Sequence, residues 1–247
     1  MNTMWNPKEI CRFVDLTSLN TSDSNKSIDQ FLNQALDYDK KGFTVAAVCL
    51  FPNFGRKAVE KLEASDIKTA VVAGSFPSSQ SFLSVRLHEC ELALEAGVDE
   101  IDIVLNIGEL LDKNYSHVSD EIRAFKNLMG DKKLKVILET GLLKETSLIK
   151  KAAELAITGG ADFIKTSTGK GFPGADLDAV IEMANVIASH YKESHKKVGL
   201  KISGGVKTYS DAIRYFEKVE SILGEKFMTP NLLRIGASSL VQNLMDE

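Results

Sequence analysis

The sequence predicts an α/β protein of the closed (β/α)8-barrel class, a TIM barrel with a short N-terminal helix. Eight short apolar runs rich in β-branched residues recur along the chain, separated by segments with helical periodicity. Several runs, such as Val45–Leu50, are continuously apolar, which is typical of parallel strands covered on both faces. The length of 247 residues is close to the roughly 250 residues of a single-domain barrel. An open, doubly wound sheet has the same alternation of strands and helices and is the alternative fold.

The expected strands are the eight apolar runs, and strand–helix alternation repeated in this way predicts a parallel sheet. The runs are Val14–Leu19, Phe43–Phe51, Lys68–Phe76, Glu100–Ile107, Leu134–Thr140, Asp162–Ser167, Val198–Ser203 and Leu232–Ala237.

The expected helices show apolar residues at a period of about 3.6. They cover Ile28–Lys41, Phe82–Ala96, Val118–Met129, Ser147–Ile157, Leu177–Tyr191 and Asp211–Leu223. Asn6 followed by Pro7 is the pattern of a helix cap with proline at the first helical position, so a short helix should precede the first strand. Glycines after several helices, among them Gly42 and Gly97, are expected to end them in a left-handed conformation.

Composition narrows the classes of function. With 44% hydrophobic and 26% charged residues, the chain is an ordinary globular protein, and we expect one domain over residues 1–247. A net charge of -4, without any run of five or more basic residues, argues against a nucleic acid or an anionic membrane as partner. No segment approaches the roughly 18 consecutive apolar residues of a membrane span. The first ten residues lack the apolar core of a signal peptide, and three widely spaced cysteines indicate reduced thiols in the cytoplasm.

Two lysines interrupt the expected sixth and seventh strands, whose C-terminal ends form part of the active-site face of such a barrel. Lys165 and Lys201 lie in apolar surroundings, and a lysine is rarely buried unless it is paired or used. At about 6 Å and an effective dielectric near 20, two ammonium groups repel by about 2.8 kcal/mol, or roughly two pKa units. Burial lowers a lysine pKa further, and this is how a neutral, nucleophilic amine arises. The plainer alternative is that both lysines reach solvent or pair with carboxylates.

Asp102 is the acid that matches these lysines. It lies between apolar neighbours in the expected fourth strand. Its plainer role is a buried ion pair with a strand lysine, and that role is compatible with acid–base catalysis because a general acid or base held by a lysine is also an ion pair.

A phosphate site is indicated separately by three glycine-bearing loops after consecutive strands. Gly169–Gly171 with Lys170 follows the sixth strand, Gly204–Gly205 the seventh, and Gly236–Ser239 the eighth. TIM barrels often bind phosphate with the last two of these loops, where backbone N–H groups and a helix N-terminus meet the anion. Plain helix capping by the serines is the alternative.

The remaining candidate residues carry weaker signals. Cys49 lies in the second strand, where a cysteine is more often a small core residue than a nucleophile. The sequence holds no metal-ligand spacing and no dinucleotide-binding glycine motif, which disfavours metal-dependent catalysis. The four histidines are expected on the surfaces of helices: they are His88, His117, His190 and His195.

Taken together, six segments resemble the deoxyribose-phosphate aldolase family, in the order expected for it and across about Val14 to Leu240. They are Asp15–Leu19, Glu100–Asp102, Glu139–Gly141, Phe163–Gly169, Lys201–Val206 and Gly236–Ser239.

The resemblance implies reversible cleavage of 2-deoxy-D-ribose 5-phosphate to acetaldehyde and D-glyceraldehyde 3-phosphate, without a metal or organic cofactor. It implies that Lys165 forms a Schiff base, that Lys201 tunes its pKa, and that Asp102 with Lys201 relays protons through water. The expected partners are a phosphosugar and an aldehyde, with a homodimer among the expected assemblies. The residues that match substrate-binding positions are Asp15, Thr17, Cys49, Thr168, Lys170, Gly204, Gly205, Gly236, Ser238 and Ser239.

Two segments depart from parts of the family. Leu105–Gly108 has a form found in only some members, so a different distal pocket is expected. Some members end in a tail whose tyrosine assists proton transfer, whereas Met245–Glu247 contains none, so either that step is slower or another group or water serves.

Two other functions stay open. One is a lysine-dependent aldolase or transaldolase for a different phosphosugar. The other is a non-catalytic barrel that binds a sugar phosphate, although a binder has no need of two strand lysines beside an aspartate.

Overall fold

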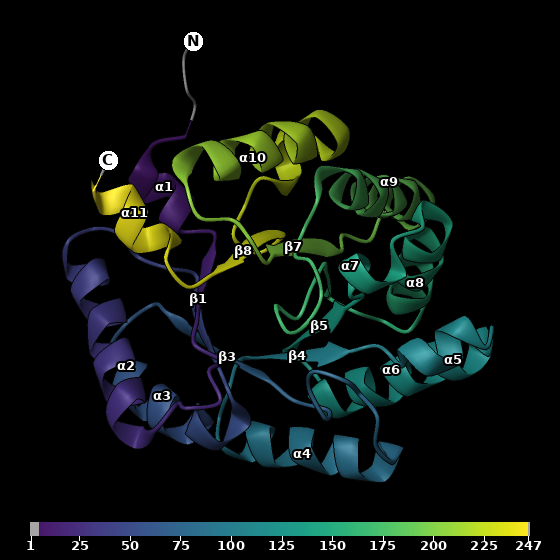
Figure 1. Cartoon of the computed structure of the whole chain (residues 1–247), viewed down its shortest axis with the longest axis horizontal. Helices are drawn as coiled ribbons and strands as arrows, with labels where there is room; N and C mark the ends of the chain where they lie inside the picture. Colours follow the sequence, from purple (N-terminus) through teal and green to yellow (C-terminus); the bar gives the residue numbers. More distant parts are fainter. Residues whose placement is uncertain (1–4, 247) are drawn as a thin grey trace.

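The strands pair in sequence order, all parallel, and β8 closes on β1. The structure is a computed structural model that describes residues 5–246. Its closed barrel, ringed by helices in Figure 1, confirms the predicted class and rules out the open sheet. The strands are β1 Val14–Thr17, β2 Ala47–Leu50, β3 Lys68–Val72, β4 Glu100–Val104, β5 Lys133–Ile137, β6 Phe163–Lys165, β7 Gly199–Ser203 and β8 Leu233–Ala237.

Most of the expected runs extend beyond the C-terminal ends of the strands. The residues there leave the sheet because they form the loops and short helices above the barrel. Asn106 caps α5, Ile107–Leu111, by accepting a hydrogen bond from the backbone N–H of Glu109. Thr140 begins α7, Thr140–Leu143. Both residues belong to runs expected as strands, and these two strand boundaries are wrong.

The periodic helices and the N-terminal helix are confirmed. Asn6 and Glu9 form a reciprocal capping box at the start of α1. Gly42 and Gly97 have φ of 81° and 92°, as expected of left-handed helix ends. Three short helices, α3, α5 and α7, were not predicted, whereas α11 is the short helix expected after Ser238 and Ser239. The helices are α1 Pro7–Cys11, α2 Asn25–Lys40, α3 Gly55–Leu62, α4 Leu83–Glu95, α5, α6 Tyr115–Met129, α7, α8 Thr146–Thr158, α9 Leu177–Ser194, α10 Tyr209–Leu223 and α11 Leu240–Asp246, with 3-10 turns η1 Pro52–Phe54 and η2 Glu225–Phe227.

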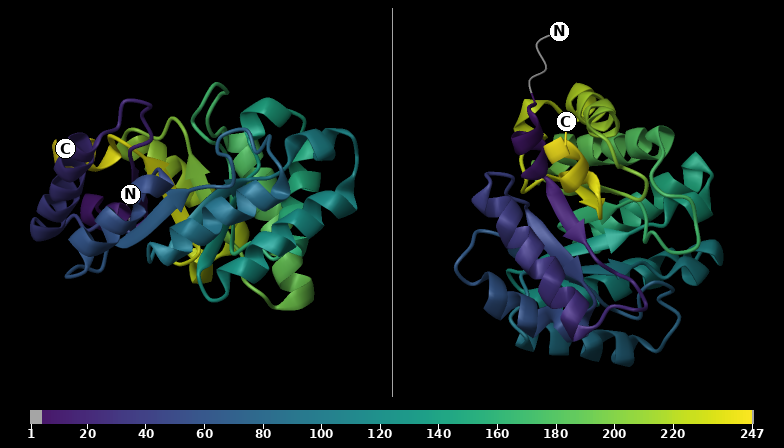
Figure 2. Two further views of the ribbon diagram at one scale, coloured as in Figure 1. Left: turned by 90° about the horizontal axis from the view of Figure 1, so that it is seen from below. Right: turned by 60° about the vertical axis from the view of Figure 1, so that its left-hand side comes forward.

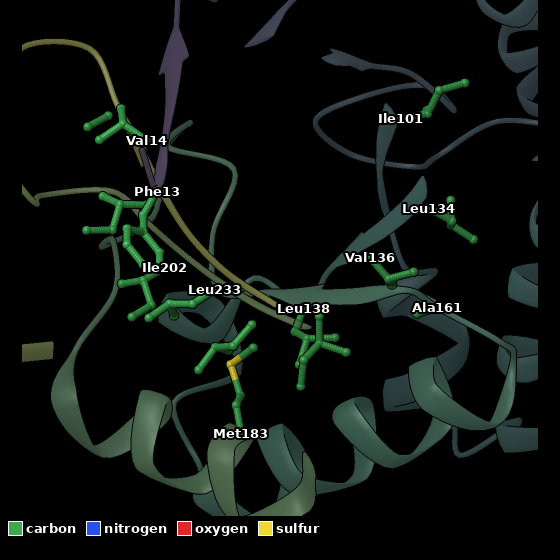
Figure 3. Close-up of a cluster of buried hydrophobic side chains, with 14 of the residues drawn as sticks. Phe13, Val14, Ile101, Leu134, Val136, Leu138, Ala161, Met183, Ile202 and Leu233 are labelled. Carbon is green, nitrogen blue, oxygen red and sulfur yellow. The ribbon is translucent and has the colours of Figure 1, made fainter. Parts of the chain in front are cut away.

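The main hydrophobic core lies between the barrel and its helices. Outward-facing strand residues such as Ile202 and Leu233 are fully buried beneath them. Figure 3 shows part of this layer, where Met183 of α9 points from its helix toward the strands. The side views in Figure 2 show the helices covering the outside of the barrel. Burying each such side chain contributes roughly 1.5–3 kcal/mol, so this layer fixes the strands and leaves their inner faces free for other chemistry.

The inner face of the barrel is apolar on one side and charged on the other. β2 and β3 contribute the small apolar residues Ala47, Cys49, Ala70 and Val72. The other strands contribute seven charged residues to the interior, all of them buried: Asp15, Glu100, Asp102, Lys135, Lys165, Lys201 and Arg234. The barrel therefore holds a polar interior against one apolar wall.

The first and last helices of the described chain, α1 and α11, lie side by side (Figures 1 and 2). Within residues 5–246, no helix has both the length and the apolar character needed to cross a bilayer. Two sequence expectations fall partly outside the described residues: the absence of a signal peptide involves Met1–Met4, and the missing terminal tyrosine involves Glu247.

Candidate active site

A cavity of about 260 Å³ lies at the C-terminal ends of β1, β6, β7 and β8. Barrel enzymes carry their active sites on this face, at the C-terminal ends of the strands. The predicted site residues that line it are Thr17, Lys165, Thr168, Lys170, Gly204, Gly205, Gly236, Ser238 and Ser239. Asn20 and Lys207, which the sequence did not single out, also line it.

The other four predicted residues lie beneath this cavity. Asp15, Cys49, Asp102 and Lys201 have no exposed surface. Lys165, by contrast, keeps 3% of its surface exposed and lines the cavity. The structure thus brings all three predicted catalytic residues together, but only Lys165 reaches the space a substrate would fill.

Asp102 joins the lysines to one another. Its Oδ2 accepts hydrogen bonds from Lys165 Nζ at 2.8 Å and Lys201 Nζ at 2.7 Å. Its Oδ1 accepts one from Lys135 Nζ at 2.8 Å. The strand register explains the cluster, because Lys165 lies opposite Lys201 in the β6–β7 ladder and Asp102 lies opposite Lys135 in the β4–β5 ladder.

The interior charges form a closed ring of alternating sign. Lys135 Nζ also lies 2.6 Å from Glu100, whose other oxygen lies 2.9 Å from Arg234. Arg234 lies 2.5 Å from one oxygen of Asp15, and Lys201 lies 2.5 Å from the other. The ring runs in the order Arg234, Glu100, Lys135, Asp102, Lys201, Asp15 and back to Arg234, with Lys165 attached at Asp102.

Three members of this ring were not predicted from the sequence, namely Glu100, Lys135 and Arg234. Each interrupts or opens an apolar run, as Lys201 does, so a signal was present. Their proximity depends on the barrel register, which the sequence alone does not give.

The lysines differ in how many carboxylates they contact. Burial lowers the pKa of Lys165, Lys201 lowers it further, and the single carboxylate of Asp102 does not offset them, so the pKa falls below its ordinary value of 10.5. Burial acts in the same direction on Lys201, but Asp102 and Asp15 outweigh it and raise its pKa. Lys135 likewise has its pKa raised, by Asp102 and Glu100. Lys165 is therefore the interior lysine most ready to lose its proton.

Asp102 is held in its ionised form. Burial would raise its pKa, but Lys135, Lys165 and Lys201 outweigh that effect and hold it well below 3.8. A buried carboxylate in this state accepts a proton only transiently, which suits a proton relay.

At the outer end of the cavity, backbone atoms of the glycine loops are not covered by side chains. Gly169 and Gly205 have φ of 76° and 93°, and nothing lies within 4 Å of the place where a side chain would begin. Exposed Ser238 and Ser239 directly precede α11. Lys170 Nζ donates to the carbonyl of Leu19, so the loop after β6 is joined to the loop after β1. These loops can present N–H groups, hydroxyls and one ammonium to an anion.

A buried carboxylate fixes the base of the loop after β6. Glu139, in a left-handed conformation with φ of 56°, accepts a hydrogen bond from the backbone N–H of Thr168 at 3.1 Å and another from its hydroxyl. A Cβ on Gly141 would lie 2.1 Å from the carbonyl oxygen of Pro173, so the same loop packs against α7. Thr168 and Lys170 are thereby held at the cavity.

The surroundings of the weaker candidate residues, Cys49 and the histidines, are explained by structural roles alone. Cys49 is fully buried on the apolar wall, and burial raises its pKa. The side chains of His88 and His117 are 67% and 53% exposed, and no group of three potential metal-ligating side chains is found among residues 5–246. A second cavity, of about 530 Å³, lies on the outer surface between α8 and α9, away from these residues.

The protein is a closed parallel barrel in which a lysine of lowered pKa faces a cavity and lies beside a buried carboxylate. These features are those of lysine-dependent barrel enzymes. A family model described as DeoC/LacD family aldolase matches residues 11–239. The chain belongs to this family of aldolases.

Individual relatives agree with the family assignment. The deoxyribose-phosphate aldolases of Mus musculus and Homo sapiens are each 37% identical over 245 residues, covering 94% of this chain and 77% of theirs. A solved deoxyribose phosphate aldolase from Aeropyrum pernix, which is tetrameric, is 26% identical, with a TM-score of 0.76 over 98% of this chain and 92% of that one. Triosephosphate isomerase from Bartonella henselae is 14% identical, covers 95% of this chain and 100% of that one, and with a TM-score of 0.57 shares the fold alone.

Proposed function

We propose that the protein is a class I aldolase that reversibly cleaves 2-deoxy-D-ribose 5-phosphate to D-glyceraldehyde 3-phosphate and acetaldehyde through an imine on Lys165. The observation that carries this proposal is the asymmetry of the interior lysines. Of the three lysines inside the barrel, Lys165 is the one that lines the cavity, and it pairs with a single carboxylate. Lys201 and Lys135 are fully buried and pair with two and three carboxylates, respectively. The family and the names of the relatives support the choice of substrate.

The chemistry begins with the neutral amine of Lys165. It attacks C1 of the open-chain sugar, and loss of water leaves a protonated imine. As the C3 hydroxyl loses its proton, the electrons of the C2–C3 bond move into the imine and D-glyceraldehyde 3-phosphate departs. Protonation of the remaining enamine at C2, followed by hydrolysis, releases acetaldehyde and restores the amine.

Asp102 is our candidate for the base. Its Oδ2 lies 2.8 Å from Lys165 Nζ, directly below the position of the imine, and it would reach the C3 hydroxyl through a water molecule. Lys201 donates to the same oxygen at 2.7 Å and is placed to return the proton.

The rest of the predicted site binds the substrate in this proposal. The loops carrying Lys170, Gly204–Gly205 and Gly236–Ser239 hold the phosphate, at the end of the cavity away from the buried ring. Thr17 and Thr168 also line the cavity, where they would bind the sugar hydroxyls. Asp15 and Cys49 act from beneath, Asp15 by holding Lys201 at 2.5 Å and Cys49 as part of the apolar wall.

The direct test is product formation. The purified protein is incubated with 2-deoxyribose 5-phosphate, and both acetaldehyde and D-glyceraldehyde 3-phosphate are measured, with Lys165→Met as the control. Formation of both products by the wild type and of neither by the control supports the proposal. Turnover of another phosphosugar only would indicate a different aldolase or a transaldolase, and binding without turnover would indicate a non-catalytic barrel.

We also propose a homodimer in the cytoplasm. Phe82, Val85 and Leu92 are 82%, 53% and 53% exposed at and along α4, and such an apolar stripe suits a self-complementary interface. The tetrameric structure of the Aeropyrum pernix relative shows that a member of this family can self-associate. The mass in solution of the wild type and of Phe82→Asp tests the dimer, which the substitution should dissociate.

The proposed cytoplasmic location is supported by the cysteines. All three are free and buried, which fits a reducing compartment.

A further inference from the structure

The ring of interior charges is electrically balanced without Lys165. Arg234, Lys135 and Lys201 alternate with Glu100, Asp102 and Asp15, so three cations face three anions. Lys165 is a seventh charge that contacts only Asp102. When Lys165 is protonated, the barrel interior holds one excess positive charge, and an uncompensated buried charge is unfavourable.

Two ring members lie far from any substrate. Glu100 and Arg234 are 3% and 4% exposed and do not line the catalytic cavity. They line a depression on the opposite, N-terminal face of the barrel, together with Lys68, Lys133 and Asn231. Neither residue can therefore act on the reaction by touching the substrate.

We propose that Glu100 and Arg234 are positioning residues whose opposite charges keep the ring neutral and thereby determine whether Lys165 carries a proton. The inference rests on the proposed role of Lys165 as the imine-forming residue. It assigns a function to a buried Arg–Glu pair that would otherwise have a purely structural explanation.

The surroundings of Lys165 support transmission through charge. The groups that act on Lys165 from the strands are Asp102 of β4, Lys201 of β7 and the thiol of Cys49 of β2. Behind them, Lys135 of β5 pairs with Asp102 and Asp15 of β1 pairs with Lys201, while β3 contributes the apolar Ala70 and Val72. Apart from the thiol, every one of these groups belongs to the ring. At an effective dielectric of about 20, one unit charge within about 10 Å changes a pKa by about one unit.

The two single substitutions have opposite expected signs. Arg234→Met removes a positive charge, so Lys165 keeps its proton more readily and the neutral amine appears at higher pH. Glu100→Gln removes a negative charge and has the reverse effect. The double variant removes one charge of each sign and leaves the ring neutral, so its behaviour should return to that of the wild type.

The readout is the pH midpoint of imine trapping with acetaldehyde and borohydride. The neutral amine attacks the carbonyl carbon, water leaves, and hydride from borohydride adds to the imine carbon to give a stable ethylamine, which is weighed by mass spectrometry. We expect the midpoint to move up by about one pH unit in Arg234→Met, down by about one in Glu100→Gln, and back in the double variant.

The chain offers a matched control in a second buried Arg–Glu pair. Arg86 Nη1 lies 2.7 Å from Glu121 Oε2, and their side chains are 1% and 6% exposed. This pair joins α4 to α6 outside the barrel. Neither Arg86→Met nor Arg86→Met/Glu121→Gln should move the trapping midpoint, even where stability falls.

Two proteins with a balanced ring keep the proposal testable if a single variant, with one charge left unpaired, fails to fold. The double variant and Arg234→Lys both preserve a neutral ring, so each should trap acetaldehyde with the wild-type midpoint. A shifted midpoint in either, or shifts of the same sign in both single variants, would overturn the inference while leaving the proposed function intact. Failure of the wild type to form any adduct on Lys165 would overturn both.

Discussion

Lys165 and Lys201 lie opposite each other in the β6–β7 ladder and donate to the same oxygen, Oδ2 of Asp102, at 2.8 and 2.7 Å. Their further contacts differ, because Lys201 also binds Asp15 and Lys165 opens onto the cavity. Lys201 therefore remains charged when Lys165 loses its proton. Two chemically identical side chains on neighbouring strands thus acquire different roles from one additional carboxylate.

Replacement of Lys201 tests this division directly. Lys201→Leu removes a charge that lowers the pKa of Lys165 and leaves Asp102 free to stabilise its ammonium form. The pKa of Lys165 should rise, so the midpoint of imine formation should move to higher pH by about one to two units. The pH dependence of trapping measures this shift. An unchanged midpoint with a large loss of rate would mean that Lys201 serves only as a proton donor.

Asp102 should also support the fold, in a way that depends on pH. Its pKa lies below the ordinary 3.8 in the folded protein, so its ionised form stabilises the fold above that value, and the stabilisation is lost as pH falls further. Asp102→Asn breaks buried ion pairs and should lower the free energy of unfolding by about 3–5 kcal/mol at pH 7. Urea unfolding of both proteins at several pH values measures the difference, which should shrink below about pH 4. A difference independent of pH would contradict an ionic role.

The contact between Glu139 and Thr168 should matter for substrate binding. Thr168→Val removes the hydroxyl that donates to Glu139 and leaves a buried acceptor short of a partner, which costs about 1–3 kcal/mol of stability. The loop that carries Lys170 should loosen, so KM for the phosphorylated sugar should rise more than kcat falls. Thr168→Ser keeps the hydroxyl and should behave like the wild type. Equal kinetics in the valine and serine variants would show that the contact does not position the loop.

Recognition of the phosphate is tested by charge repulsion. Ser239→Asp places a carboxylate at the end of the cavity where the three loops meet. It should penalise the phosphorylated sugar far more than the free one. The measurement is the ratio of kcat/KM for 2-deoxyribose 5-phosphate to that for 2-deoxyribose, in both proteins. A fall of less than about tenfold, equivalent to 1.4 kcal/mol, would mean that the phosphate binds elsewhere.

Much of the fold could be predicted because buried strands and helices place apolar residues in the sequence at characteristic spacings. Continuous apolar runs located all eight strands, and the 3.6-residue period located the long helices. The short helices α5 and α7 were missed because five and four residues are too few to show a 3.6-residue period, and the expected strands ran into the first residue of each. Nothing in such a segment shows where the sheet hydrogen bonds stop.

The residues of the candidate site could be predicted less completely. Lys165, Lys201 and Asp102 stood out because each interrupts an apolar run. Lys135 did not, since in Lys133–Lys135 the charges alternate with an apolar residue as they do in a solvent-exposed strand. The depth of Asp15 below the cavity, and the closure of the ring through Arg234, depend on the register between β1 and β8, which only the structure supplies.

The site of covalent trapping tests the proposed role of Lys165 most directly. The wild type is treated with acetaldehyde and borohydride, digested, and sequenced by mass spectrometry, alongside Lys165→Met and Lys201→Met. We expect one ethyl group on Lys165 in the wild type, none anywhere in the interior of Lys165→Met, and an adduct still on Lys165 in Lys201→Met at raised pH. An ethyl group on Lys201 or Lys135 instead of Lys165 would contradict this role.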